Sequence, residues 1–179
     1  AVWMQILKEV NDSVLWLLVS NDETSKNLTK EAEKSGVNKN RLVFAKYVPI
    51  KEHLNRIKHA DLFVDNLPYN AHTTSSDALR MGLPVLTCVG KSFASRVAAS
   101  LLNAVSLPEL ITTTQQEYEE LAIELATNPK QLKLIKDKLA KNLPSAPLYD
   151  TPLFTKHLES AYKTMYNRYH EGLEPDHIY

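Results

Sequence analysis

The sequence predicts an α/β domain in which a parallel sheet carries helices on both faces. Three features lead to this prediction: short apolar runs alternate with amphipathic segments, the runs are too apolar for strands with one face in water, and polar loops follow them. The four predicted strands cover residues 13–19, 41–44, 61–64 and 85–89.

Helical spacing of apolar residues marks the segments between and after these strands. The predicted helices cover residues 2–10, 23–35, 51–59, 73–81, 92–102 and 152–169, with two more short helices separated at Asn128 and Pro129. Gly36 and Gly82 follow two of these helices, and glycine best tolerates the left-handed conformation at a helix end. This alternation predicts an open, Rossmann-like domain whose strand order cannot be read from the sequence.

Length and composition predict one domain over residues 1–179, mainly helical over 115–179. The 179 residues are 44% hydrophobic, which is enough for a single buried core. The chain begins with Ala1 instead of Met, and helical spacing starts at Val2. We therefore expect a fragment of a longer protein.

Charge and apolar content exclude several classes of partner. Lys and Arg total 21, as do Asp and Glu, so no net field attracts nucleic acid or an anionic membrane. The longest apolar run, residues 14–19, is too short to cross a bilayer, and the N-terminus does not resemble a secretory leader. Cys88, the lone cysteine, is expected as a buried thiol. These features predict a cytoplasmic protein.

The loop from Asp65 to the predicted helix at residue 73 is the most informative stretch for function. In parallel sheets, ligands bind beyond the carboxyl ends of the strands. Thr73 and Thr74 would begin the helix, where amides without intrahelical partners and the helix dipole favour an anion such as a diphosphate. Alternatively, Thr74 and Asp77 form only a Thr-x-x-Asp capping box. The spacing leaves both interpretations open.

A second polar cluster follows the second predicted strand. Lys51 could meet a phosphate or a ribose, and His53 and Arg56 lie three residues apart, close to one face of a helix. Alternatively, all three are ordinary surface residues of a charged helix. Neither His53 nor His72 has the ligand spacing of a zinc site, so we expect no metal and no cofactor.

The last predicted helix carries a stripe of aromatic residues. Tyr162, Tyr166 and Tyr169 recur at helical spacing. The stripe is either core packing or an interface to a missing domain.

Two segments resemble one enzyme family closely. NAHTTSSDALRMGLPVLT, residues 70–87, and SFASRVAAS, residues 92–100, resemble the C-terminal catalytic lobe of O-GlcNAc transferases, including bacterial and SPINDLY-type members of glycosyltransferase family 41. The opening VWMQILKEVNDSVLWLL and the closing PDHI are also similar to that family. The resemblance implies a GT-B fold, with two Rossmann-like lobes of which this one binds the UDP moiety of UDP-GlcNAc.

The resemblance also implies roles for individual residues of the phosphate and ribose side. Thr73 and Thr74 match the diphosphate ligands, with His72 beside them. Asp77 matches the carboxylate that accepts hydrogen bonds from the ribose. Tyr69 stands where animal enzymes have a small residue near the N-acetyl group of the sugar.

On the base side, His53 matches a histidine near the uracil. Arg56 and the backbone around Val48 match positions that contact the base. Ile50 stands where animal enzymes have a nucleotide-contacting lysine, so Lys51 is displaced by one position.

The implied activity is transfer of N-acetylglucosamine from UDP-GlcNAc to Ser or Thr hydroxyls of proteins, with inversion and without a metal. Family members carry the general base, the acceptor groove and tetratricopeptide repeats upstream, so we expect no catalytic residue here and no turnover by the isolated fragment. The alternatives are a transferase that uses another donor such as GDP-fucose, a nucleotide-sugar epimerase, and a non-catalytic lobe for protein association.

Overall fold

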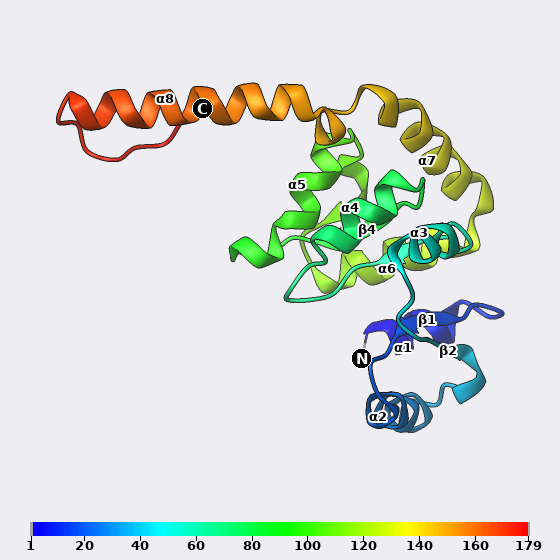
Figure 1. The fold of residues 1–179 in the computed structure, drawn as a ribbon. Helices are drawn as coiled ribbons and strands as arrows, with labels where there is room; N and C mark the ends of the chain where they lie inside the picture. The colour runs from blue at the N-terminus through cyan, green and yellow to red at the C-terminus, as the bar shows by residue number, and fades with distance from the viewer. Residues whose placement is uncertain (1, 179) are drawn as a thin grey trace.

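The computed structural model of the protein describes residues 2–178, so Ala1 and Tyr179, the ends of the predicted domain, lie outside the described residues. Strands and helices alternate up to residue 127 and helices alone follow (Figure 1). The strands are β1 (Leu15–Leu18), β2 (Leu42–Ala45), β3 (Phe63–Val64), β4 (Val85–Cys88) and β5 (Ile111–Thr112). The α-helices are α1 (Val2–Glu9), α2 (Asp22–Lys34), α3 (Ile50–Ile57), α4 (Thr73–Arg80), α5 (Val97–Ala104), α6 (Gln115–Thr127), α7 (Pro129–Asn142) and α8 (Thr151–His170).

All strand pairs are parallel, as predicted. β1 pairs with β2, and β4 lies between β3 and β5. The described strands thus form two hydrogen-bonded groups, and the half-buried side chain of Val64 on β3 packs against apolar clusters of both. The sequence did not predict β5, because two residues are too few to show a strand pattern.

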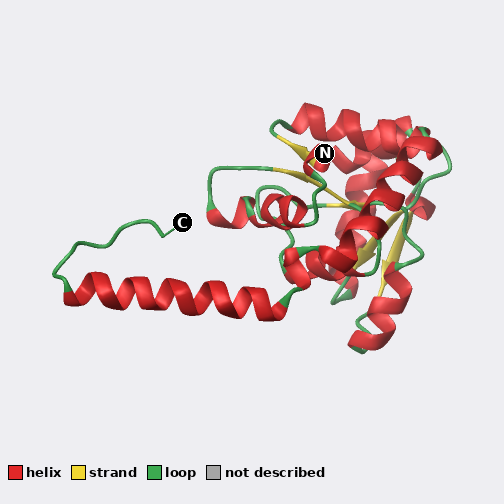
Figure 2. Ribbon diagram, turned by 90° about the horizontal axis from the view of Figure 1, so that it is seen from above, coloured by secondary structure: helices red, strands yellow, loops and turns green. Residues whose placement is uncertain are grey.

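Helices cover both faces of the strands, which lie between them in Figure 2. β4 is buried at all four residues. Val85 packs in a cluster with residues of α4 and α5, whereas Leu86 and Cys88 pack with residues of α6 and α1. Successive side chains of a strand point to opposite faces, so β4 joins the two layers. The thiol of Cys88 is buried, as predicted.

The structure confirms that glycines end two of the predicted helices, and it divides a third predicted helix. Gly36 and Gly82 follow α2 and α4 with φ values of +78° and +81°, the left-handed region that favours glycine. The helix predicted over residues 92–102 was wrong, because it is divided. A 3₁₀ turn, Phe93–Ser95, comes first, closed by a capping box of Ser92 and Ser95, and α5 begins only at Val97.

Helix α8 extends away from the body of the molecule (Figure 1). None of its residues is buried, and Tyr162, Tyr166 and Tyr169 are exposed. The interpretation of this stripe as core packing was therefore wrong. The segment directly before α8 is bonded to α4, since the Tyr149 hydroxyl donates to the Ser76 carbonyl at 2.7 Å.

Among residues 2–178, no helix combines the length and the apolar character needed to cross a lipid bilayer.

Arg41 ties the start of β2 to the end of α1. Its guanidinium donates to the carbonyls of Leu7, Val10 and Ser13, the last two at 2.6 and 2.8 Å, and to the Ser13 hydroxyl at 2.8 Å. The last carbonyls of a helix have no intrahelical partners. Arg41 therefore caps α1 and fixes the turn into β1.

We predict that Arg41→Met lowers the free energy of unfolding by about 2 to 4 kcal/mol, because hydrogen bonds from a charged donor contribute about 1.5 to 3 kcal/mol each and water replaces part of them. Urea denaturation measures this. The control is Arg96→Met, at an exposed arginine, which should change stability by less than about 0.5 kcal/mol. Equal effects of the two substitutions would contradict the capping role.

Candidate functional site

The predicted site residues lie on two consecutive βα connections. Residues 46–49 lead from β2 into α3, and residues 65–72 lead from β3 into α4. Both connections leave the carboxyl ends of parallel strands, the edge at which α/β sheets bind ligands. Helices α3 and α4, which follow the two connections, contact each other.

A buried carboxylate holds the connection between β3 and α4. Asp65 is 1% exposed. Its Oδ1 accepts from the backbone N–H groups of Asn66 at 2.8 Å and Ala71 at 2.6 Å. Its Oδ2 accepts from the Thr87 hydroxyl at 2.6 Å. The loop is thereby closed on itself and attached to β4.

Two opposing effects act on the pKa of Asp65. Burial raises it above the ordinary value for aspartate, and hydrogen bonds from Ala71, Thr87 and Asn66 act in the opposite direction because they favour the charged form. The backbone carbonyl of Asp65 also accepts from the Tyr118 hydroxyl at 2.9 Å. Both carboxylate oxygens and the backbone carbonyl of Asp65 thus have hydrogen-bond partners.

The first turn of α4 is not capped by a side chain. His72 precedes the helix without a capping hydrogen bond, and Thr73 and Thr74 are its first two residues and are exposed. The capping-box interpretation of Thr74 and Asp77 was therefore wrong. The first amides of a helix have no intrahelical acceptor and sit at the positive end of its dipole. This terminus is suited to an anion.

Aromatic rings flank the residue before α4. The His72 ring stacks on Tyr69, with centroids 5.1 Å apart, and meets the edge of Phe93 at 6.0 Å. Its Nε2 lies 3.4 Å from the Ala94 carbonyl. Tyr69 and Phe93 are 64% and 73% exposed, so they form an accessible apolar wall beside the helix start.

Two polar atoms near this turn are buried without a hydrogen-bond partner. They are Oδ1 of Asn70 and Oγ of Ser75. Asn70 is otherwise held, since its side-chain amide donates to the Asn66 carbonyl at 3.1 Å and its backbone N–H to the Ala94 carbonyl at 2.9 Å. Buried polar groups are usually paired, so the turn retains unused hydrogen-bonding capacity.

On α3, Arg56 is held from three sides. It donates to the Lys46 carbonyl at 2.8 Å, and two of its nitrogens lie 3.3 and 3.4 Å from Nδ1 of His53. Its guanidinium carbon stands 5.8 Å from the ring centroid of Trp16 on β1, within cation–π range. The structure therefore brings His53 and Arg56 together, and the Lys46 carbonyl and Trp16 hold Arg56 in place.

The other predicted residues have no such fixation. Lys51 is exposed at the start of α3, Val48 is half-buried in the preceding connection, and Asp77 is half-buried on α4, one turn after Thr73. Among the described residues, neither the Lys51 ammonium nor the Asp77 carboxylate has a hydrogen-bond or ion-pair partner. These charged groups are available to a ligand.

Sequence reasoning missed four residues that support this site: Asp65, Thr87, Trp16 and Phe93. Asp65 carried a signal, since an acidic residue directly after a buried strand begins the polar loop. Trp16 and Thr87 sat in strands that read as uniformly apolar core. Phe93 fell in a helix whose start was misplaced. Their roles depend on contacts between distant segments.

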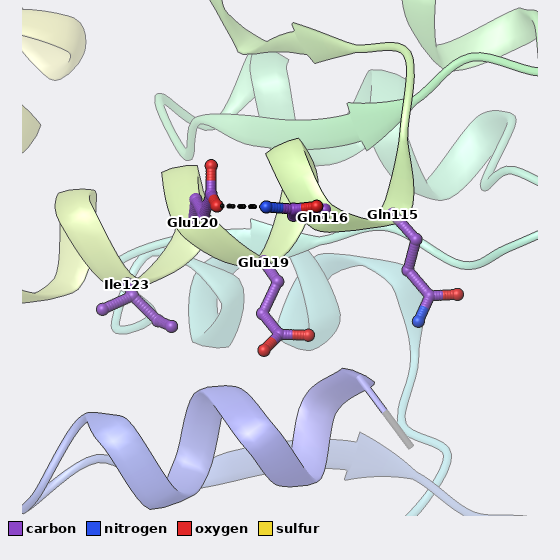
Figure 3. A pocket seen from close by; sticks show the side chains of 5 residues that line it. All are labelled: Gln115, Gln116, Glu119, Glu120 and Ile123. Carbon is purple, nitrogen blue, oxygen red and sulfur yellow. Dashed lines mark hydrogen bonds between the residues drawn. The ribbon is translucent and has the colours of Figure 1, made fainter.

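The surface hollow along α6 lies elsewhere. Its lining, Gln115, Gln116, Glu119, Glu120 and Ile123, comes from one helix that faces α1 (Figure 3). Within it, Gln116 donates to Glu120 at 2.9 Å, and none of the predicted site residues contributes. Among residues 2–178, no group of three or more His, Cys, Asp and Glu side chains is placed to hold a metal ion.

Known proteins similar to this chain carry consistent names. The UDP-N-acetylglucosamine–peptide N-acetylglucosaminyltransferase of Caenorhabditis elegans is 34% identical over 177 residues, which is 99% of this chain and 15% of that protein. The probable enzyme of this name in Arabidopsis thaliana, SEC, is 35% identical over 177 residues, 98% of this chain and 18% of that protein. A probable SPINDLY enzyme of Hordeum vulgare is 36% identical over 124 residues, 69% of this chain and 13% of that protein.

A solved structure matches the fold. A variant of the O-GlcNAc transferase of Thermobaculum terrenum superposes with a TM-score of 0.87 at 34% identity, over 92% of this chain and 32% of that chain. This match confirms the predicted fold, a catalytic lobe of the O-GlcNAc transferase type.

The chain therefore spans less than a fifth of the curated relatives and about a third of the solved chain. The profile of glycosyl transferase family 41 matches residues 1–158. Together with relatives above 30% identity over nearly the whole chain, this match establishes that the chain belongs to glycosyl transferase family 41, a family of glycosyltransferases.

Proposed function

We propose that this chain is the UDP-binding lobe of a cytoplasmic enzyme that transfers N-acetylglucosamine from UDP-GlcNAc to Ser or Thr hydroxyls of proteins. The names of the relatives support the donor and the peptide acceptor. The observation that carries the proposal is the uncapped start of α4, with exposed Thr73 and Thr74. We assign acceptor binding to another lobe and to tetratricopeptide repeats of the complete protein.

The diphosphate is proposed to bind at the start of α4. Amides of the first turn and the hydroxyls of Thr73 and Thr74 would donate to its oxygens. In transfer, the acceptor oxygen bonds to the anomeric carbon as the bond from that carbon to the diphosphate breaks, while a base in the other lobe takes the hydroxyl proton. Negative charge grows on the leaving UDP, and donors fixed in advance stabilise it.

The nucleoside is proposed to lie across α3 and α4. Asp77, one turn into α4, would accept hydrogen bonds from the ribose hydroxyls, and the absence of a hydrogen bond or ion pair at its carboxylate among the described residues supports this role. His53 and Arg56, with the backbone near Val48, would border the uracil. Because Trp16 and the Lys46 carbonyl already hold Arg56, little side-chain entropy would be lost on binding.

The sugar is proposed to lie beside His72 and Tyr69. The exposed Tyr69 ring stacked on His72 would border the acyl side of the donor. A tyrosine narrows that space more than a small residue does, so Tyr69 is the position at which donor choice would be tuned. Lys51 is assigned only a peripheral contact with phosphate or ribose.

We predict that two substitutions separate phosphate from ribose recognition. Thr73→Ala should weaken UDP about tenfold to a hundredfold and leave uridine nearly unchanged, because a bond to a charged phosphate contributes about 1.5 to 3 kcal/mol. Asp77→Asn should weaken UDP and uridine by similar factors, because both carry the ribose. Titration calorimetry measures each.

The control is Thr155→Ala, a helical threonine on α8 whose hydroxyl bonds only its own helix, at the Thr151 carbonyl. It should leave both affinities unchanged. Folded Thr73→Ala and Asp77→Asn proteins with unaltered UDP affinity would remove these residues from the site.

The proposed activity is tested with the full-length protein and acceptor peptides. Incubation with UDP-GlcNAc should yield peptides carrying N-acetylglucosamine, GDP-fucose should yield none, and the 179-residue chain alone should bind UDP without transfer, because positioning by both lobes supplies much of the rate. Mass spectrometry identifies the product. Fucosylated peptides would contradict the proposed donor, and an epimerised nucleotide sugar would contradict the proposed transfer reaction. Absence of UDP binding would leave only the role of a lobe for protein association.

A further inference from the structure

We infer that Asp65 is a positioning residue of the diphosphate site: its carboxylate fixes the Ala71 amide and thereby the place at which α4 begins. The inference rests on the proposed function, because it concerns the site at which the diphosphate of a UDP-sugar would bind. It adds a residue that touches no ligand and acts through the backbone.

The Asp65 carboxylate bridges the two ends of the loop before α4. Oδ1 accepts from the amide of the next residue, Asn66, and from that of Ala71, six residues along the chain. Ala71 directly precedes His72, which is the cap residue of α4. One oxygen atom therefore joins the end of β3 to the start of the helix whose amides would meet the phosphates.

The second carboxylate oxygen of Asp65 is bonded to the sheet. Oδ2 accepts from the hydroxyl of Thr87, which is fully buried on β4. The Thr87 carbonyl in turn accepts from the Thr112 hydroxyl on β5 at 3.0 Å, and the Tyr118 hydroxyl of α6 holds the Asp65 carbonyl. The loop thus takes its position from β4 and α6, which bond Asp65 directly, whereas Thr112 bonds only the backbone of β4.

A carboxylate is a costly choice for a purely structural role. Burial destabilises the charged form of the carboxylate and therefore raises its pKa. An apolar side chain in its place would avoid this desolvation cost. A carboxylate can accept two amides on one oxygen and a hydroxyl on the other, and an aliphatic side chain accepts none. The arrangement defines where Ala71 lies, which is what an anion site built from backbone amides needs.

The experiment compares Asp65→Ala, Asp65→Asn and Thr87→Val in the full-length protein, by titration with UDP and with uridine. Asp65→Ala should weaken UDP at least about tenfold and uridine less than about twofold, because only the phosphate turn shifts. Asp65→Asn should keep UDP affinity within about threefold of wild type. Its side-chain oxygen can accept hydrogen bonds from both amides, and its NH₂ group can donate to the Thr87 hydroxyl oxygen. Thr87→Val should fall between them.

The matched control is Thr112→Val, which removes a buried threonine hydroxyl from β5 without touching the loop. It should leave the ratio of UDP to uridine affinity unchanged. Hydrogen exchange of residues 66–74 without nucleotide gives a second measurement. Exchange should quicken in Asp65→Ala and in Thr87→Val, and stay as in wild type in Asp65→Asn and Thr112→Val.

An unchanged affinity ratio in folded Asp65→Ala or in Thr87→Val would overturn the inference, as would a loss in Asp65→Asn equal to that in Asp65→Ala. If Asp65→Ala does not fold, Thr87→Val and Asp65→Asn decide the matter. A wild-type protein that binds no UDP would refute the proposed function instead, and the exchange of residues 66–74 would still test whether Asp65 holds the turn.

Discussion

The buried carboxylate of Asp65 is the interaction on which the candidate site depends. It fixes the backbone of the polar loop before α4, because the Ala71 amide cannot move without losing its 2.6 Å hydrogen bond to the carboxylate. Backbone amides carry no rotatable side chain with which to adjust to a ligand. Their position is set only by the path of the chain, and here the path is set by Asp65, Thr87 and the core beneath them.

The two halves of the proposed nucleotide site come from strand groups that share no hydrogen bonds. The base side follows β2 and the phosphate side follows β3. Contact between α3 and α4, and the packing of Val64 against the clusters on both sides, hold these halves in register. The spacing between base and diphosphate subsites is therefore a property of side-chain packing and not of a continuous sheet.

Much of this was predictable from local pattern. Apolar runs, glycine stops at Gly36 and Gly82 and the polar turn before Thr73 gave the parallel α/β fold and the helix whose start carries the site. The sequence could not decide between a capping box and an anion site, since Thr74 and Asp77 fit both until the helix start at Thr73 was located. Asp65 and Thr87 lie 22 residues apart, and Trp16 reaches Arg56 from another strand. Only the tertiary structure reveals pairs of this kind.

A crystal structure of the full-length protein with UDP tests the central claim most directly. The account predicts the diphosphate within hydrogen-bond distance of the first-turn amides of α4 and the hydroxyls of Thr73 and Thr74, with the ribose on Asp77 and the uracil beside Arg56. Asp65 should keep its bonds to Ala71 and Thr87 beneath the ligand. A nucleotide bound away from the start of α4, or an Asp65 side chain turned to contact the ligand itself, would contradict it.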